Sequence, residues 1–188
     1  DAEIIADSLV QADLRCVSSH GILRVPLYLK RVMSGVLNTQ PKRTIVRVTL
    51  ATALIDGDHG FGQPAGWQAM HLAMEKAEKC GIGAVGVKNS HHIGAAAYYV
   101  SLAGQRDMIG IAVTNTPPLM APWGGKSLMI GNNPYGVYIP AGKERPIVFD
   151  MAFSQVAQGK ISVALAKNEK IPLDWATDNQ GQPTDDPK

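Results

Sequence analysis

Apolar residues recur at helical spacing at the start of the chain, which predicts two helices before residue 36. The first helix covers residues 1–17. The second is expected to begin near Ser18 or Ser19, either of which is a favourable N-cap, and Gly35 ends it. Its expected apolar face consists of Leu23, Leu27, Leu29 and Val32.

Beyond these helices the pattern alternates between strands and helices. Strands are expected at residues 46–55, 82–87, 108–113, 135–139 and 146–149, and helices at residues 63–79, 95–106 and 154–167. The strand at residues 82–87 should be buried, and residues 56–60 should form a turn. Gly81 should end the helix at residues 63–79. Residues 114–133 form a long loop, and loops of this length are usually functional or disordered.

This order of elements indicates an α/β fold, or an α+β fold, with a mixed sheet. A Rossmann domain is disfavoured, because no GxGxxG segment follows a strand and opens a helix. We expect a helical segment at residues 1–47, a mixed α/β domain at residues 48–170, and a polar tail at residues 171–188 that leads into a further part of the protein.

Composition favours a soluble cytoplasmic protein. Of the 188 residues, 45% are hydrophobic and 18% charged, and no apolar run approaches the roughly 20 residues of a membrane helix. The chain opens without a basic signal segment. Cys16 and Cys80 lie far apart, so neither a disulfide framework nor a metal site is expected. The net charge of +2 is too small to indicate nucleic acid, and a mild excess of basic over acidic residues before Val48 suits a small anionic ligand better.

The segment Ser19-His20-Gly21, followed by Arg24, is the first that could carry chemistry. A histidine titrates near neutrality and can give a proton to a carbonyl oxygen as it is reduced. An arginine one turn later can hold a carboxylate by two parallel hydrogen bonds. The alternative is a capping serine beside a solvated histidine and arginine. Taken alone, the segment favours this alternative.

His91 and His92 lie between an expected strand and an expected helix, where α/β enzymes place ligands. Adjacent side chains point to different sides, and no HxxxH or HExxH pattern is present, so zinc is disfavoured. One of the two histidines is expected to cap a loop or to fill the core. A weaker alternative is a metal-dependent hydrolase that uses His59, His91 and His92.

Polar residues bracket the long loop and follow a later strand. Backbone amides and asparagine side chains at either end of the loop could cradle a pyrophosphate or an amide group. A carboxylate at the end of a strand could cap a helix, orient a histidine or bind a ribose hydroxyl. Turns and caps use the same residue types, so each signal is weak. The candidate cofactor-binding residues are Asn115, Thr116, Asn133, Asp150, Met151, Ala152 and Lys160.

As an ordered set, these segments resemble the type-2 malate/L-lactate dehydrogenase family. The matching stretches are SHGILRVPLYLKR (19–31), DGDHGFGQPAG (56–66), GIGAVGVKNSHHIGAAAYYV (81–100), GIAVTNTPPLMAPWGG (110–125), IGNNPYGVYIP (130–140), VFDMA (148–152) and IPLDWATDNQGQPTDDP (171–187). The resemblance covers essentially the whole chain.

The resemblance implies an NAD- or NADP-dependent oxidoreductase, acting on CH–OH, that interconverts a small 2-hydroxyacid and its 2-oxoacid. It implies a non-Rossmann cofactor domain beside a helical domain, and typically a homodimer. His20 and His92 fall on histidines credited with proton transfer in different members. Arg24 falls on the arginine that grips the substrate carboxylate, and Ser19 is the second candidate substrate-binding residue. Thr116 and residues 150–152 fall on positions that contact the nicotinamide cofactor.

Members of the family begin one helix earlier and continue well beyond residue 188, so the resemblance implies that the chain is a fragment. Two alternatives stay open. One is a reductase of a cyclic 2-imino acid from the same family, and the other is a non-catalytic paralogue that keeps a ligand pocket. The sequence does not choose the substrate, the acid/base histidine, or NAD over NADP.

Overall fold

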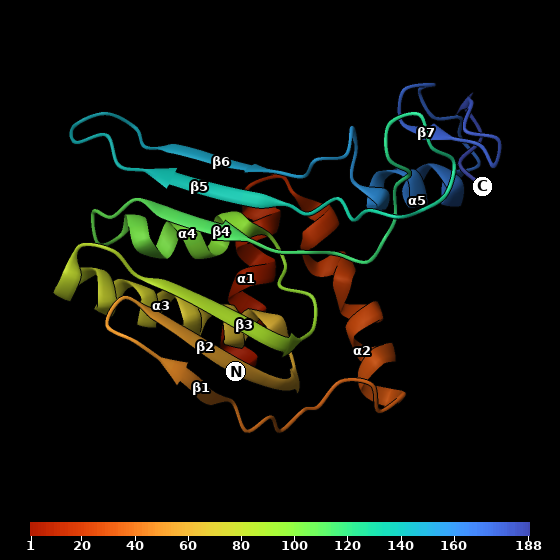
Figure 1. The fold of residues 1–188 in the computed structure, drawn as a ribbon. Coiled ribbons are helices and arrows are strands. Elements are labelled where there is room, and N and C mark those ends of the chain that lie inside the picture. The colour runs from red at the N-terminus through yellow and green to blue at the C-terminus, as the bar shows by residue number, and fades with distance from the viewer. The chain divides into compact units, whose positions relative to one another are not determined.

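The computed structural model describes residues 1–188 as a mixture of helices and short strands (Figure 1). The helices are α1 (Ala2–Leu14), the short 3₁₀ turns η1 (Ser18–His20) and η2 (Ile22–Arg24), α2 (Val25–Met33), α3 (Gly62–Cys80), α4 (Ala96–Gly104) and α5 (Gln158–Lys167). The strands are β1 (Thr44–Val48), β2 (Thr52–Gly60), β3 (Ala84–Ser90), β4 (Gly110–Val113), β5 (Tyr135–Ile139), β6 (Ile147–Met151), β7 (Ala176–Thr177) and β8 (Pro183–Thr184). The predicted mixed α/β class is confirmed.

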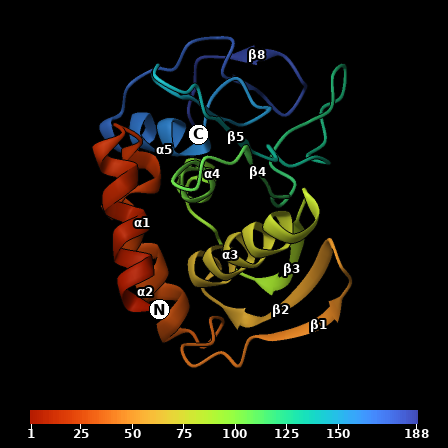
Figure 2. The same cartoon turned by 90° about the vertical axis from the view of Figure 1, so that its left-hand side faces the viewer.

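The first sheet has the order β1-β2-β3, with β1 antiparallel to β2 and β2 parallel to β3. Figure 2 shows α3 lying across one face of this sheet. Ile55 in β2 is fully buried, and the ammonium of Lys76 in α3 donates to the Thr49 carbonyl at 2.6 Å, in the turn between β1 and β2. The helix and the hairpin are therefore joined by apolar packing and by a charge-assisted hydrogen bond.

Helix α3 follows its sequence prediction. Pro64 lies in the first turn, where the missing N–H does no harm, and Gly81 adopts φ +83° and ends the helix. Met74 is buried, together with Ala65 and Ala69. Helical periodicity was sufficient here because one side of the helix packs on the sheet.

Three expectations about this region are wrong. Residues 56–60 are not a separate turn: they complete β2, although Asp58 and His59 have the positive φ that favours turns. Strand β3 is not buried, because α3 covers only one face of the sheet and the strand alternates between half-buried and exposed residues. The apolar face predicted for the second helix is also wrong, since Leu27 and Leu29 are exposed and Tyr28 is the buried residue of α2.

The region between α1 and α2 also differs from a continuous helix starting at Ser18 or Ser19. Two 3₁₀ turns come first, and α2 begins at Val25 with a proline in its first turn. The cause is not local: the carboxylate of Asp13 in α1 accepts the Ile22 N–H at 2.9 Å. A side chain at Gly21 would overlap that carboxylate. The start of the last helix also differs from its prediction: α5 begins at Gln158, four residues later than expected.

The second sheet has the order β4-β5-β6. A turn joins β5 and β6, and in it the Glu144 N–H donates to the Ala141 carbonyl at 3.0 Å. Helix α4 is the most buried helix of the chain, and Val100 is fully buried. Gly110 in β4 lies against the backbone of Val100, where a Cβ would crowd the carbonyl oxygen at 2.8 Å. Close packing between helix and strand therefore requires glycine at this position.

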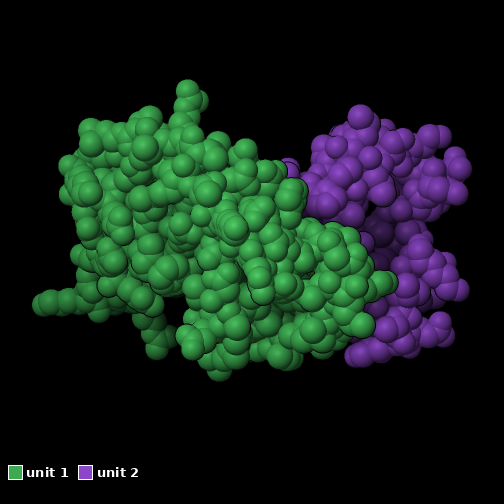
Figure 3. All heavy atoms as spheres, turned by 90° about the horizontal axis from the view of Figure 1, so that it is seen from below, with its two compact units in different colours: residues 1–112, 136–149 green, residues 113–135, 150–188 purple.

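The chain forms two compact units (Figure 3). Unit 1 comprises residues 1–112 and 136–149, and unit 2 comprises residues 113–135 and 150–188. The division at residues 47 and 170 stays a prediction. Among the helices, none combines the length and the hydrophobicity needed to span a membrane.

Replacing Gly62 by alanine should destabilise unit 1. A Cβ at this buried position would overlap the carbonyl oxygens of His91 and His92 in the loop after β3. We expect a loss of about 1–3 kcal/mol in the free energy of unfolding, measured by urea denaturation. The matched control is Gly86→Ala, where the new methyl meets only the end of the Leu54 side chain at 3.2 Å. Equal losses in the two variants would contradict the steric explanation.

Candidate active site and cofactor pocket

A cluster of polar and aromatic side chains lies within unit 1 and is assembled from four parts of the chain. The 3₁₀ turns η1 and η2 supply Ser19, His20 and Arg24, and α2 supplies Tyr28. His92 comes from the loop between β3 and α4. The structure thus brings together all four unit 1 residues of the predicted site: Ser19, His20, Arg24 and His92.

The turn that carries His20 is held by its own polar groups. The Arg24 Nε–H donates to the Ser19 carbonyl at 2.6 Å, and Ser19 Oγ lies 3.0 Å from His20 Nδ1. The Asp13 carboxylate that accepts the Ile22 N–H fixes the turn from α1. These contacts add to the backbone hydrogen bonds of the 3₁₀ turns, such as the one from the Gly21 N–H to the Ser18 carbonyl at 3.1 Å.

The two histidines stack on each other. The ring centroids of His20 and His92 are 5.6 Å apart, with 23° between the ring planes. Tyr28 Oη lies 2.8 Å from His92 Nδ1, and the Gly94 N–H donates to the same nitrogen at 3.2 Å. Each imidazole is therefore oriented at Nδ1 by a neighbour.

A second layer of side chains surrounds Tyr28. The Gln63 Nε2–H donates to Tyr28 Oη at 2.9 Å, and Gln63 is fully buried at the start of α3. The ring of Phe61 meets Tyr28 edge to face, with centroids 5.6 Å apart. Aromatic packing and a hydrogen bond together restrict the position of the phenol.

Both imidazoles are uncharged at neutral pH. Burial, and to a smaller extent the Arg24 guanidinium, lowers the pKa of His20 from 6.5 to about 4. Burial also lowers the pKa of His92 to about 3, with further contributions from Arg24, His20 and Arg31. Burial raises the pKa of Tyr28, so the phenol keeps its proton. The cluster thus holds neutral proton carriers beside a fixed positive charge.

The lowered pKa values predict acid sensitivity. Unfolded histidines take up a proton near pH 6.5, whereas His20 and His92 in the folded chain do so only near pH 4 and pH 3. As the pH falls from 6.5, the unfolded state binds more protons, and the free energy of unfolding decreases until about pH 3. The expected loss is on the order of 2–5 kcal/mol between pH 7 and pH 4.5.

Urea denaturation across this pH range measures that loss. The double variant His20→Gln/His92→Gln should show a shallower decline than the unmodified chain. The matched control is His59→Gln, because His59 is exposed in β2. A decline in the double variant as steep as in the unmodified chain would assign the acid sensitivity to other groups.

The other two histidines considered from the sequence lie elsewhere in unit 1. The Nε2 of His91 lies 3.1 Å from the Val36 carbonyl oxygen. His91 therefore has the loop role expected for one of the adjacent pair. His59 is exposed. No three histidine, cysteine or acidic side chains come close enough to hold a metal ion.

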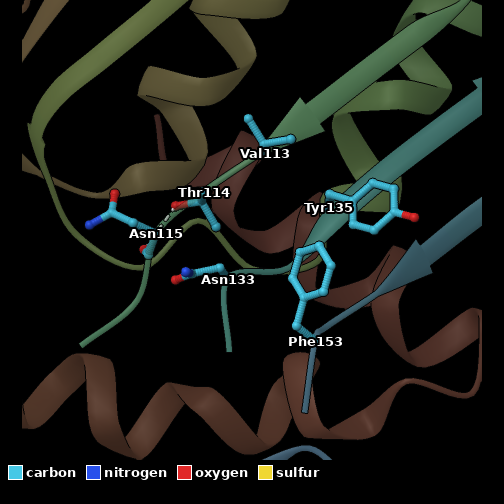
Figure 4. A pocket seen from close by; sticks show the side chains of 6 residues that line it. All are labelled: Val113, Thr114, Asn115, Asn133, Tyr135 and Phe153. Carbon is cyan, nitrogen blue, oxygen red and sulfur yellow. Dashed lines mark hydrogen bonds between the residues drawn. The ribbon is translucent and has the colours of Figure 1, made fainter. Parts of the chain in front are cut away.

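A pocket of about 450 Å³ lies within unit 2 (Figure 4). The rings of Tyr135 and Phe153 form one wall, with centroids 5.5 Å apart and 23° between their planes. Thr114, Asn115 and Asn133 provide its polar edge, and Val113 completes the lining. Two of the predicted cofactor-binding residues, Asn115 and Asn133, thus line the same pocket.

Three side chains tie the two ends of the long loop together beside this pocket. The Thr116 N–H donates to Asn133 Oδ1 at 3.0 Å, and the Thr116 hydroxyl donates to Asn132 Oδ1 at 2.8 Å. Gly131 lies so close to Thr116 that a Cβ would overlap its carbonyl oxygen. We call the set of Thr116, Asn132 and Asn133 the loop clasp.

The remaining predicted cofactor-binding residues do not line the pocket. Asp150 and Met151 end β6, and Ala152 follows them directly before the pocket residue Phe153. Lys160 lies in the first turn of α5, where its ammonium is 6.0 Å from the ring centroid of Trp175. Their roles toward a cofactor stay predictions.

Sequence reasoning missed Tyr28, Gln63, Tyr135 and Phe153. A signal for Tyr28 was present, because it follows Arg24 by four residues and so lies one turn further along the same side of the chain. Gln63 carried no signal, since a glutamine at the start of an amphipathic helix is usually solvated. The aromatic pair comes from two separate strand ends, and only the tertiary structure brings its members together.

These features fit the result of comparison with known proteins. Residues 1–188 match the family model of malate/L-lactate dehydrogenase, and the chain belongs to this family. A malate dehydrogenase of Pyrococcus abyssi is 47% identical over 184 residues, which are 98% of this chain and 51% of that protein. The (2R)-3-sulfolactate dehydrogenase (NADP(+)) of Chromohalobacter salexigens is 36% identical over 100% of this chain and 56% of its own length.

Solved structures agree with the sequence relatives. The sulfolactate dehydrogenase of Methanocaldococcus jannaschii superimposes with a TM-score of 0.90 at 47% identity, over 99% of this chain and 54% of that one. The chain spans about half the length of the relatives it matches. Its mixed α/β elements with small sheets are therefore those of a dehydrogenase structure.

Proposed function

We propose that the protein is an oxidoreductase that interconverts a small 2-hydroxyacid and its 2-oxoacid with NAD or NADP. The observation that carries this proposal is the stacked pair His20 and His92 beside the Arg24 guanidinium. A 2-oxoacid offers a carboxylate for the guanidinium and a carbonyl oxygen for an imidazole. Membership of the malate/L-lactate dehydrogenase family supports the same reaction.

Each residue has a defined task in this proposal. Arg24 binds the substrate carboxylate and, since its charge depresses both histidine pKa values, the bound anion offsets that depression. His20, protonated with the help of the bound anion, then gives one proton to the C2 oxygen on reduction, while the neutral His92 donates a hydrogen bond to the same oxygen. Ser19 supports this by orienting His20 at Nδ1.

The pocket of unit 2 fits a nicotinamide cofactor. Its volume of about 450 Å³ lies within the range of small-molecule sites. The Tyr135 and Phe153 rings offer a flat apolar wall, and the Asn115 and Asn133 amides match a carboxamide or ribose hydroxyls. When bound, the reduced cofactor supplies the hydride that reaches C2 of the substrate. Thr116, Asp150, Met151, Ala152 and Lys160 are proposed as further contacts.

Three finer features belong to the same proposal. The mixed α/β region is a non-Rossmann cofactor-binding domain, and residues 1–47 are the helical segment of a second domain. The absence of a GxGxxG segment supports the first point. The protein is further proposed to act as a homodimer in the cytoplasm.

The test is turnover by the intact protein. Absorbance of the reduced nicotinamide is followed with a panel of oxaloacetate, pyruvate, sulfopyruvate and a cyclic 2-imino acid, each with NADH and with NADPH. Consumption with one of the 2-oxoacids is the expected result. Consumption with the imino acid alone would instead indicate a reductase of that class. Cofactor binding without turnover of any substrate would indicate a non-catalytic paralogue.

Removing the ring of Phe153 should weaken cofactor binding. We expect Phe153→Ala to raise the Kd for the reduced nicotinamide about 10-fold, because one aromatic contact contributes on the order of 1 kcal/mol beyond its buried area. Titration monitored by nicotinamide fluorescence measures the change. Ile147→Ala serves as the control, because Ile147 is exposed and does not line the pocket. An unchanged Kd in Phe153→Ala would remove the ring from the cofactor site.

A further inference from the structure

The hydrogen-bond directions around His92 follow from a donor that cannot reverse. A backbone N–H only donates, so the Gly94 N–H, although at the long distance of 3.2 Å, favours an unprotonated His92 Nδ1. Tyr28 Oη lies 2.8 Å from the same nitrogen, and its hydroxyl must therefore donate as well. A neutral imidazole with an unprotonated Nδ1 carries its proton on Nε2.

Gln63 decides which way the Tyr28 hydroxyl points. Its Nε2–H donates to Tyr28 Oη at 2.9 Å, which leaves the phenol hydrogen free to turn toward His92. With the amide turned round, Gln63 Oε1 would accept that hydrogen, and His92 Nδ1 would keep only the longer hydrogen bond from the Gly94 N–H. In the observed orientation Gln63 Oε1 is buried and has no hydrogen-bond partner. An unsatisfied buried acceptor is unfavourable, so the hydrogen bond from Gln63 Nε2 to Tyr28 holds this orientation against that cost.

We propose that Gln63 is a positioning residue that acts through Tyr28 to hold His92 as its neutral Nε2–H tautomer. This inference rests on the proposed function and refines it. His92 presents an N–H, and not a lone pair, to the C2 oxygen of the substrate. Such a donor polarises the carbonyl and stabilises the oxygen as negative charge develops on it.

The second histidine of the stack lacks this constraint. His20 Nδ1 has the Ser19 hydroxyl as its neighbour, at 3.0 Å, and a hydroxyl can either donate or accept. When His20 Nδ1 gains or loses a proton, the Ser19 hydroxyl can turn to accept or to donate, so no N–H of His20 is left facing an O–H of Ser19. The fixed tautomer is particular to His92 and to its partners Tyr28, Gln63 and Gly94.

The experiment is ¹⁵N NMR of the histidine side chains in the intact protein at neutral pH, together with steady-state kinetics. In the unmodified protein His92 should show an unprotonated Nδ1 and a protonated Nε2. Gln63→Leu should give a mixture of the two tautomers and lower kcat about 10-fold with little change in the substrate KM, as expected when an imidazole loses its orienting partner. In Gln63→Glu the carboxylate should accept the Tyr28 hydroxyl and shift the His92 proton toward Nδ1.

The matched control is Gln68→Leu on the same helix, whose Oε1 accepts from the Arg43 Nε–H at 3.1 Å. It should leave the His92 signals unchanged. A protonated Nδ1 in the unmodified protein, or an unchanged tautomer in Gln63→Leu, would overturn the proposal. Should Gln63→Leu not fold, the spectra of the unmodified protein and Gln63→Glu decide the question. Expected spectra without turnover of any substrate would refute the proposed function and leave the tautomer assignment standing.

Discussion

Arg24→Ala is expected to lower kcat/KM for the 2-oxoacid by roughly 100- to 1000-fold, since truncating one partner of a buried charge pair costs about 2–5 kcal/mol. The physical reason is that the substrate carboxylate loses its guanidinium. The side chain also anchors the His20 turn through the Ser19 carbonyl, so part of the loss should appear in kcat. Steady-state kinetics with saturating reduced cofactor measures both constants.

Two comparisons separate the carboxylate contact from a general disturbance. Lys30→Ala removes a positive charge from an exposed position of the neighbouring helix α2 and should leave kcat/KM within about twofold. The Kd of the reduced cofactor should not change in Arg24→Ala, because the pocket of unit 2 does not include Arg24. Unchanged use of the 2-oxoacid by Arg24→Ala would exclude this residue from substrate binding.

His20→Asn should lower kcat by about 100- to 10,000-fold, the usual contribution of a positioned acid or base. His92→Asn should lower kcat by about 100- to 1000-fold, the usual contribution of a positioned hydrogen-bond donor. Asparagine retains a polar side chain of similar reach but cannot exchange a proton. The double variant should be little slower than the slower single variant, because residues that act as a unit are not additive. Single-turnover measurements with the intact protein, at fixed cofactor and saturating substrate, provide the rates.

His91→Asn is the matched control for this series. Its ring lies at the Val36 carbonyl and not in the stack, so its kcat should stay near that of the unmodified protein. Fully additive losses from His20→Asn and His92→Asn would mean that the two imidazoles act in separate steps. A normal kcat in either single variant would show that the imidazole concerned takes no part in proton transfer.

Local patterns were sufficient where a helix has one buried side and a clear end. Periodicity and Gly81 predicted α3, and proline at residue 26 was compatible with the first turn of α2. Local sequence patterns did not predict the conformation of segments that depend on a residue outside the segment. The two 3₁₀ turns depend on Asp13, and the buried residue of α2 is Tyr28 because its hydroxyl reaches His92 and Gln63.

The sequence indicated which residues could form the candidate site, and it did not indicate their geometry. Histidine and arginine types pointed to proton transfer and carboxylate binding, and these need no tertiary information. The stacking of His20 on His92 depends on packing between segments far apart in the sequence. The role inferred for Gln63 depends on burial, because only a desolvated amide can dictate the direction of a hydrogen bond.

The loop clasp has a consequence for how the family can diversify. Thr116, Asn132 and Asn133 close the loop at its base, and the backbone of Met120 pairs with that of Ile130 further along. Insertions at the tip of such a loop add only closure entropy, about 0.6 kcal/mol for each doubling of its length. The tip can therefore accept new lengths and sequences in evolution or by engineering, while the pocket beside the clasp keeps its shape.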